Sequence, residues 1–255
     1  RILSGVMAES SFLFMGAVYH KRAVSVQMVE TVVFLLRREE KTRTIMLISV
    51  RRSTATYIAD LHIHSRFSRA TSRDCDLPHL DWWSRRKGIG LVGTGDFTHP
   101  AWRAELRERL APAGEGVYVL REEFRLPGAP AGEPPGFVVT GEISSIYKWD
   151  GKTRRVHNLI LLPSLEAADA LSARLEAVGN IRSDGRPILG LDSRDLLEMT
   201  LEACPEAELI PAHIWTPHFS MFGAFTGFER VEECFGDLAP HIHAVETGLS
   251  SDPPM

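Results

Sequence analysis

Short apolar runs separated by helical segments are the feature that most constrains the fold of this chain. From about Thr56 onward, several runs have the length of a buried strand. These runs are Tyr57–Ile63, Gly90–Val92, Phe137–Thr140, Val156–Leu162, Glu208–Ala212 and Ile242–Val245. The segments with helical patterns between them are Leu77–Lys87, Trp102–Leu110, Leu165–Val178 and Ser193–Cys204. This alternation predicts an α/β fold with a mostly parallel sheet, either open or closed into a barrel.

The first 45 residues are predicted to lie outside this domain. The sequence begins with Arg1 rather than Met, and the apolar runs Ser11–Val18 and Val29–Leu36 are shorter than a membrane span. No pattern typical of a signal peptide is present. We therefore expect an N-terminal extension over residues 1–45, which reflects a mis-assigned start, and one domain over residues 56–255.

The composition excludes several classes of protein. Of the 255 residues, 44% are hydrophobic and 24% are charged, which is ordinary for a globular protein. The net charge of -4 means that any surface for nucleic acid is a local patch. Cys75, Cys204 and Cys234 are far apart in the sequence, which indicates a reducing, cytoplasmic setting and neither disulfides nor a cysteine-based zinc site.

His62 and His64 stand two residues apart at the end of the first apolar run. Side chains at positions i and i+2 of a strand point to the same face. Both imidazoles can therefore bind one metal ion while Ile63 points into the apolar packing. A pair of this kind is also typical of structural histidines, so the interpretation depends on further ligands.

Further potential ligands stand at the boundaries of the later runs. Asp96 ends the second run, Glu142 the third, and His213 the fifth, while His157 opens the fourth. In a parallel barrel the C-terminal ends of the strands meet on one face, so these side chains are predicted to share a site. Taken singly, Asp96 could be a helix cap, Glu142 a solvated turn carboxylate and His157 a core histidine. The set as a whole favours a metal centre.

Imidazole and carboxylate ligands without thiolates suit Zn²⁺, Mn²⁺ or Fe²⁺. The number of candidate ligands exceeds that of one tetrahedral ion, which favours a cluster of two or three ions. Such clusters support the hydrolysis of phosphoesters. Amide hydrolysis or deamination at a similar barrel site is the main chemical alternative.

A resemblance to a known superfamily rests on several segments in order. They read Asp-Leu-His-Ile-His-Ser, Gly-Thr-Gly-Asp, Glu-Ile-Ser, Arg-Arg-Val-His-Asn-Leu-Ile, Pro-Ala-His-Ile-Trp-Thr-Pro-His-Phe and Glu-Thr-Gly-Leu-Ser-Ser-Asp. From about Tyr57 to Met255 the chain resembles the polymerase-and-histidinol-phosphatase (PHP) superfamily, and within it the endonuclease Q-like group. The resemblance implies a distorted (β/α)7 barrel of the TIM-like type.

The resemblance also implies a metal site and an activity. Its ligands, carried over by motif, are His62, His64, Asp96, Glu142, His157 and His213. They would bind two or three divalent ions, with Zn²⁺ or Mn²⁺ favoured over Fe²⁺ or Mg²⁺. The implied activity is cleavage of a DNA strand 5′ to a deaminated or abasic nucleotide in DNA repair. The family completes its site with a late Asp-x-His element, which this sequence does not contain, so we expect a chain truncated at its C-terminus, without the last strand.

Two residues are candidates for direct catalysis, Asp96 and His218. His218 lies five residues beyond His213 on the expected catalytic loop, where it would bind the scissile phosphate or act as a general acid. An ordinary loop histidine is the alternative interpretation.

Aromatic and basic side chains are the candidates for contact with DNA. Phe219, Phe222 and Phe225, with glycines between them, are suited to stack on an extruded base or to wedge into a duplex. A hydrophobic cap over the barrel mouth is the alternative. The arginines predicted to contact phosphates are Arg66, Arg69 and Arg73. Arg154 and Arg155 are expected in solvent, at the end of their strand that lies away from the site.

The leading hypothesis is thus a metal-dependent endonuclease that acts on damaged DNA, with no membrane association. A phosphatase of small phosphomonoesters is the second hypothesis. The third is an inactive metal-binding fragment that requires a missing C-terminal region.

Overall fold

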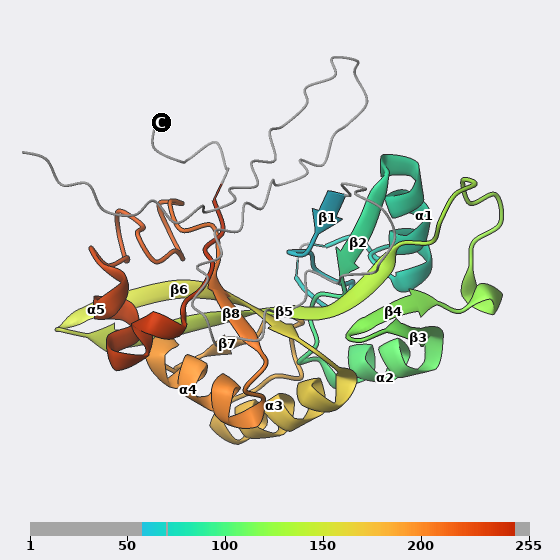
Figure 1. The fold of residues 1–255 in the computed structure, drawn as a ribbon. Helices are drawn as coiled ribbons and strands as arrows, with labels where there is room; N and C mark the ends of the chain where they lie inside the picture. Colours follow the sequence, from blue (N-terminus) through green and yellow to red (C-terminus); the bar gives the residue numbers. More distant parts are fainter. Residues whose placement is uncertain (1–57, 70, 248–255) are drawn as a thin grey trace, which may run out of the picture.

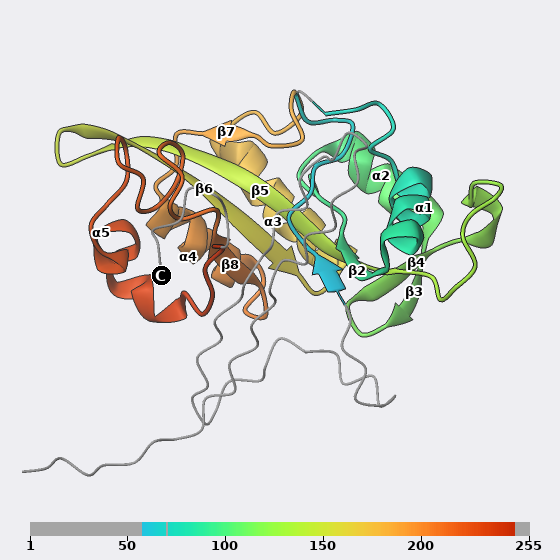
Figure 2. The same cartoon turned by 90° about the horizontal axis from the view of Figure 1, so that it is seen from above.

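The computed structural model describes residues 58–69 and 71–247. The predicted N-terminal extension and the residues after 247 lie outside this part of the chain. Figures 1 and 2 show a mixed α/β fold with a curled sheet. Its strands are β1 (Ile58–Asp60), β2 (Ile89–Gly93), β3 (Leu110–Gly114), β4 (Val117–Leu120), β5 (Gly136–Trp149), β6 (Lys152–Leu162), β7 (Ile188–Leu189) and β8 (Glu208–Pro211). Its helices are α1 (Leu77–Lys87), α2 (Pro100–Arg109), α3 (Leu165–Val178), α4 (Ser193–Ala203) and α5 (Val231–Phe235), with 3-10 helices η1 (Glu122–Phe124) and η2 (Gly236–His241).

Strand β5 is the centre of the sheet. Its first residues pair with β2 in parallel and with β4 in antiparallel orientation. The rest of β5 pairs with β6 in antiparallel and with β7 in parallel orientation. β1 extends the parallel side next to β2, whereas β8 is antiparallel to β6. The prediction of a mostly parallel sheet is therefore wrong: the sheet is mixed.

The antiparallel pairing of β5 and β6 follows from a tight turn. Asp150 and Gly151, which connect the two strands, both have positive φ, of 48° and 72°. This is the backbone of a two-residue hairpin turn whose twist matches that of the flanking strands, and Asp-Gly is a preferred sequence for it. The run predicted as Phe137–Thr140 is consequently the beginning of a much longer strand, and His157 lies inside β6 rather than at its start.

Local signals at the ends of helices agree with the structure. Helix α1 has the predicted bounds, because the Asp76 carboxylate accepts a hydrogen bond from the backbone N–H of His79 at its start and Gly88 ends it. Helix α3 also has the predicted bounds, with the Ser164 hydroxyl as its cap. Helices α3 and α4 lie together on one side of the long β5–β6 pair (Figure 1).

One predicted strand is absent. Residues 242–245 follow η2 and form no strand. Nearby, the backbone is held by two hydrogen bonds, from Glu246 N–H to the carbonyl of Pro211 and from Ile214 N–H to the carbonyl of Glu246. These two bonds do not make a ladder, so the apolar run packs beside β8 without becoming part of the sheet.

The core reaches directly beneath the polar segment that follows β2. Trp102 of α2 is fully buried, and its indole N–H donates to the carbonyls of Thr94 and Gly95. Satisfying the indole in this way lets a large aromatic ring support the segment that carries Asp96. Cys75, Cys204 and Cys234 are free thiols. Within the described ranges, no helix is long and apolar enough to cross a membrane.

Candidate metal centre

The carboxylate of Glu142 lies at the centre of a histidine cluster. Glu142 comes from β5, and its side chain is only 1% exposed. Four imidazole nitrogens surround its two oxygens: His62 Nε2 at 3.5 Å, His64 Nε2 at 3.2 Å, His157 Nδ1 at 2.7 Å and His213 Nε2 at 3.3 Å. The structure therefore brings five of the predicted ligands into one cluster.

These residues converge from four parts of the fold. His62 and His64 follow β1, with their ring centroids 5.7 Å apart, while Ile63 packs against the apolar core. His157 projects from the same face of the β5–β6 pair as Glu142, because it is paired with Ser144, two residues along β5. His213 follows β8 and has a φ of 33°, which is uncommon for a residue other than glycine.

Three of the rings are oriented by hydrogen bonds at Nδ1. A carboxylate can only accept, so His62 Nδ1 donates to Glu246 at 2.8 Å and His64 Nδ1 donates to Asp96 at 3.0 Å. The hydroxyl of Thr216 points its single proton at backbone carbonyls, so it accepts from His213 Nδ1 at 3.0 Å. In the neutral form each ring therefore presents the lone pair of Nε2 to Glu142.

A nitrogen lone pair that faces a carboxylate oxygen is repelled by it unless a cation or a proton lies between the two atoms. His157 shows the same feature, because its Nδ1 is buried beside Glu142 without the geometry of a hydrogen bond. The Ser144 hydroxyl, paired with His157 across the strands, is also buried without a partner among the described residues. Unsatisfied polar atoms of this kind are rare inside proteins. The donor set fits a divalent metal ion.

Two groups of side chains offer atoms close enough to share one ion. The first comprises His62, His64 and Glu142, and the second comprises Glu142, His157 and His213. Glu142 belongs to both groups. Either group offers the mixture of imidazole and carboxylate that suits Zn²⁺, Mn²⁺ or Fe²⁺.

The electrostatics of the cluster reflect its burial and its charges. Burial opposes ionisation of Glu142, but the positive charge of His62 and the close contacts of its carboxylate with His157 and His213 outweigh this effect and hold its pKa well below the usual range. Burial likewise disfavours charged His64, yet the carboxylates of Asp96 and Glu142 raise the pKa of His64 to about 9. The pKa of His157 is lowered by burial, which Glu142 only partly offsets. The centre thus holds an ionised carboxylate and attracts positive charge.

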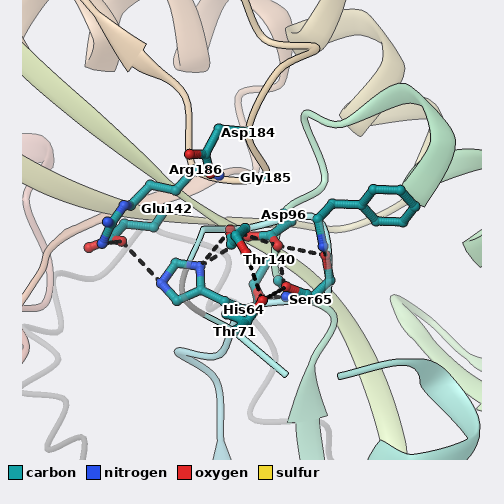
Figure 3. A network of polar contacts seen from close by, with 12 residues as sticks. His64, Ser65, Thr71, Asp96, Thr140, Glu142, Asp184, Gly185 and Arg186 are labelled. Carbon is teal, nitrogen blue, oxygen red and sulfur yellow. Dashed lines mark hydrogen bonds and ion pairs between the residues drawn. The ribbon is translucent and has the colours of Figure 1, made fainter. Parts of the chain in front are cut away.

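Asp96 contacts the cluster through His64 rather than through Glu142 (Figure 3). Its second oxygen accepts hydrogen bonds from the backbone N–H and the hydroxyl of Ser65, at 2.7 and 2.6 Å, and from the hydroxyl of Ser68 at 2.9 Å. Asp96 has a φ of 48° and is completely buried. In this structure Asp96 orients the ring of His64.

Two residues of the site have no individual role in the sequence analysis. Glu246 is fully buried and joins two ligands, because it accepts from His62 Nδ1 and from the backbone N–H of His213 at 2.7 Å. In the sequence, Glu246 is marked by its place in the Glu-Thr-Gly segment that contributes to the family resemblance. Arg186 reaches Glu142, with Nη1 3.2 Å from Oε2. No local pattern in the sequence marks Arg186.

The loop between β8 and α5 has one face packed on the site and another exposed. The ring of Phe219 packs on His157 at 4.9 Å, and Phe222 packs on Trp215 at 5.0 Å. Phe225 is 70% exposed and stacks on His218, with ring centroids 4.6 Å apart. In the described part of the chain, no hydrogen bond or ion pair joins the His218 side chain to the histidine cluster.

The predicted DNA-binding arginines differ in their surroundings. Arg66 forms ion pairs with Asp76 and Glu105, at 3.4 and 2.6 Å. Arg69 is 80% exposed beside Asp184, and Arg73 is exposed.

Arg155 lies nearer to the site than expected. It is two residues from His157 on the same face of β6, and its guanidinium lies over the ring of Phe219. The prediction that Arg155 lies at the far end of its strand is wrong, because the strand begins earlier and His157 is in its interior.

Comparison with known proteins gives a consistent set of relatives. No family model matches this chain. The uncharacterized protein MJ0043 of Methanocaldococcus jannaschii is 32% identical over 174 residues, which are 68% of this chain and 18% of that protein. The crystal structure of the lesion-specific endonuclease PfuEndoQ from Pyrococcus furiosus matches with a TM-score of 0.61 and 30% identity, over 76% of this chain and 42% of that one.

A second structure, endonuclease Q in complex with a 27-mer duplex substrate that has an abasic lesion at the active site, matches with a TM-score of 0.58 and 30% identity. That match covers 70% of this chain and 40% of the other. The chain thus spans less than half the length of each of these relatives. Over the matched residues, this chain is similar in both fold and sequence to endonuclease Q.

Proposed function

We propose that this chain carries the metal-dependent hydrolytic centre of an endonuclease that cuts damaged DNA, as a member of the endonuclease Q-like group of the PHP superfamily. The observation that carries the proposal is the buried Glu142 surrounded by four histidines. The similarity to endonuclease Q supports DNA as the substrate, because one of those structures contains a duplex with an abasic lesion at its active site. The closed (β/α)7 barrel of the superfamily remains a prediction.

The metal centre would contain two or three divalent ions, of which Zn²⁺ or Mn²⁺ is favoured by the ligand types. Glu142 would be shared between ions, since it belongs to both groups of ligands. When bound, such ions lower the pKa of water and neutralise charge on a phosphoryl group. The chain itself contributes fixed lone pairs, oriented by Glu246, Asp96 and Thr216.

The residues proposed to face the substrate are those near the centre whose side chains are exposed to solvent. The stacked pair of His218 and Phe225 would provide an aromatic surface for a base, since Phe225 is largely exposed. Phe219 and Phe222 would support this loop from within. Arg69 and Arg73 would contact phosphates of the DNA strand. Arg66 would reach a phosphate only by leaving Asp76 and Glu105.

The test uses the full chain, loaded with Mn²⁺ or Zn²⁺, and duplexes that contain one abasic site, one deoxyuridine or no damage. Bound metal is measured by mass spectrometry, and cutting on a denaturing gel. We expect bound metal and a cut 5′ to the lesion. In the His62→Ala/His64→Ala variant, cutting should fall by at least about 100-fold together with the metal content.

The matched control is His79→Ala, which removes an imidazole that bonds to Asp76 and not to the cluster. This variant should keep both metal and cutting. Hydrolysis of small phosphomonoesters without cutting of DNA would assign the centre to a phosphatase. Metal binding without either activity would support an inactive centre, and cutting that survives the double substitution would contradict the proposal.

A further inference from the structure

Arg186 lies at the rim of the histidine cluster and joins the centre to solvent. Its Nη1 is 3.2 Å from Oε2 of Glu142, the oxygen that also faces His64 Nε2. The Arg186 side chain is 39% exposed, whereas that of Glu142 is 1% exposed. Among the ion pairs of the described residues, this is the one that links an arginine or lysine to the cluster (Figure 3).

The segment that carries Arg186 is fastened to the elements that build the centre. The N–H of Gly185 donates to the carbonyl of Phe67 at 2.9 Å, and the carbonyl of Gly185 accepts from the Thr98 hydroxyl. On the other side, the N–H of Ser144 donates to the carbonyl of Pro187 at 3.0 Å. The backbone around Arg186 is thus bonded to the loop after β1, the loop after β2 and strand β5.

Gly185 explains how this segment comes so close. A Cβ atom at this position would lie 2.2 Å from an oxygen of Asp96 and 2.6 Å from the Ser68 hydroxyl. Only glycine allows the backbone to pass directly over the buried carboxylate that orients His64. The base of the Arg186 side chain is therefore held in a defined place relative to the metal ligands.

Most N–H donors of the Arg186 guanidinium are not used in the contacts of the described residues. Of its five N–H groups, the described contacts of the side chain use only Nη1, and the side chain is open to solvent. A partly exposed ion pair of this kind contributes at most about 1 kcal/mol to stability. Because Glu142 belongs to both groups of candidate metal ligands, bound cations would compensate its charge, and Arg186 is not required for that purpose. A planar fork of donors beside a metal centre instead matches the oxygens of a phosphate.

We propose that Arg186 binds a non-bridging oxygen of the scissile phosphate and stabilises the charge that develops there during cleavage. This role rests on the proposed phosphodiester hydrolysis. It assigns Arg186 as a catalytic residue for which the sequence offers no motif. Fixed donors aimed at such charge contribute substantially because their orientation is set before the reaction.

The test compares Arg186→Met and Arg186→Lys in the full, metal-loaded chain. The control is Arg182→Met on the same segment, since the Arg182 side chain is 65% exposed and pairs with Glu176 instead of the cluster. Three quantities are measured: bound metal, the affinity for inorganic phosphate by calorimetry, and kcat and KM on the duplex with an abasic site. Metal content separates a phosphate contact from a structural role.

We expect Arg186→Met to retain its metal, to bind phosphate at least about tenfold more weakly and to lose roughly 100-fold in kcat. Arg186→Lys should recover part of both losses, and Arg182→Met should behave as the unchanged chain. Loss of metal in Arg186→Met, or unchanged phosphate affinity, would overturn the assignment. If the unchanged chain cuts no DNA, the proposed function fails, while the phosphate measurement still decides the role of Arg186.

Discussion

At the scale of single residues, the centre depends on carboxylates that bind histidines rather than metal. Glu246 holds the ring of His62 and the backbone of His213, so one buried side chain sets the position of two ligands from different elements. Its charge is stabilised there: burial opposes ionisation, but the hydrogen bond from His62 and that ring's positive charge lower the pKa of Glu246. Asp96 orients the ring of His64 in the same way, by accepting a hydrogen bond from its Nδ1.

Replacing Glu246 by Gln should therefore weaken metal binding without unfolding the protein. The amide keeps the shape but loses the charge that favours the Nδ1–H form of His62, and partners of metal ligands typically change affinity by about 10- to 100-fold. Competition with a metal-binding dye measures the affinity, and circular dichroism checks the fold. Glu208→Gln is the matched control, because Glu208 forms a similar pair with His243 outside the cluster. Equal affinities in both variants would show that Glu246 has no positioning role.

At the scale of elements, the β5–β6 hairpin and the loop after β8 form one unit around His157. The N–H of His157 donates to the carbonyl of Phe219, and its carbonyl accepts from the N–H of Ala212. Within the loop, Phe228 is only 6% exposed and lies 5.3 Å from Trp149 of β5, whereas Phe225 points into solvent. The same loop therefore contains one aromatic residue that stabilises the fold and one that is free for a ligand.

The two phenylalanines should respond differently to substitution by alanine. Phe228→Ala should lower the free energy of unfolding by about 3–5 kcal/mol, because it leaves a cavity in the core. Phe225→Ala should leave that free energy nearly unchanged and weaken the binding of DNA with an abasic site by about 1–3 kcal/mol, through loss of stacking. Urea denaturation and fluorescence anisotropy measure the two quantities. Unchanged DNA affinity in Phe225→Ala would remove this loop surface from the proposed interface.

At the scale of the whole molecule, the metal centre links elements that are distant in the sequence. Its side chains come from the ends of β1 and β8 and from the interiors of β5 and β6. A ligand that binds only the folded state stabilises it by mass action, by about 2.7 kcal/mol at 100 times its Kd. Removal of the metal by a chelator should therefore lower the stability of the entire fold.

Removal of the metal with EDTA should lower Tm by roughly 5–10 °C when the ion had been present at about 100 times its Kd. Differential scanning calorimetry with and without chelator measures the change, and readdition of the ion should reverse it. The His62→Ala/His64→Ala variant should show little or no such change. A Tm that is identical in the loaded and chelated protein would contradict a metal centre formed by these elements.

The sequence by itself determined the types of ligand and the elements with strong local signals. The bounds of α1 and α3 follow from a capping side chain at the start and from the helical spacing of apolar residues, which act within a few residues of one another. The Asp150-Gly151 turn is a local signal of the same kind, because Asp-Gly is a preferred sequence for a two-residue hairpin turn. His62 and His64 follow β1 instead of belonging to it, so the periodicity of a strand does not by itself explain the closeness of their rings.

Only the tertiary structure decided how strands pair and which charges meet. The mixed sheet depends on hydrogen bonds between residues far apart in the chain, and an apolar run alone does not specify its partner or direction. For that reason residues 242–245 pack beside β8 without forming a strand. Arg186 and Glu246 reach the centre through such long-range packing, which brings a surface loop and a buried carboxylate to histidines on other elements.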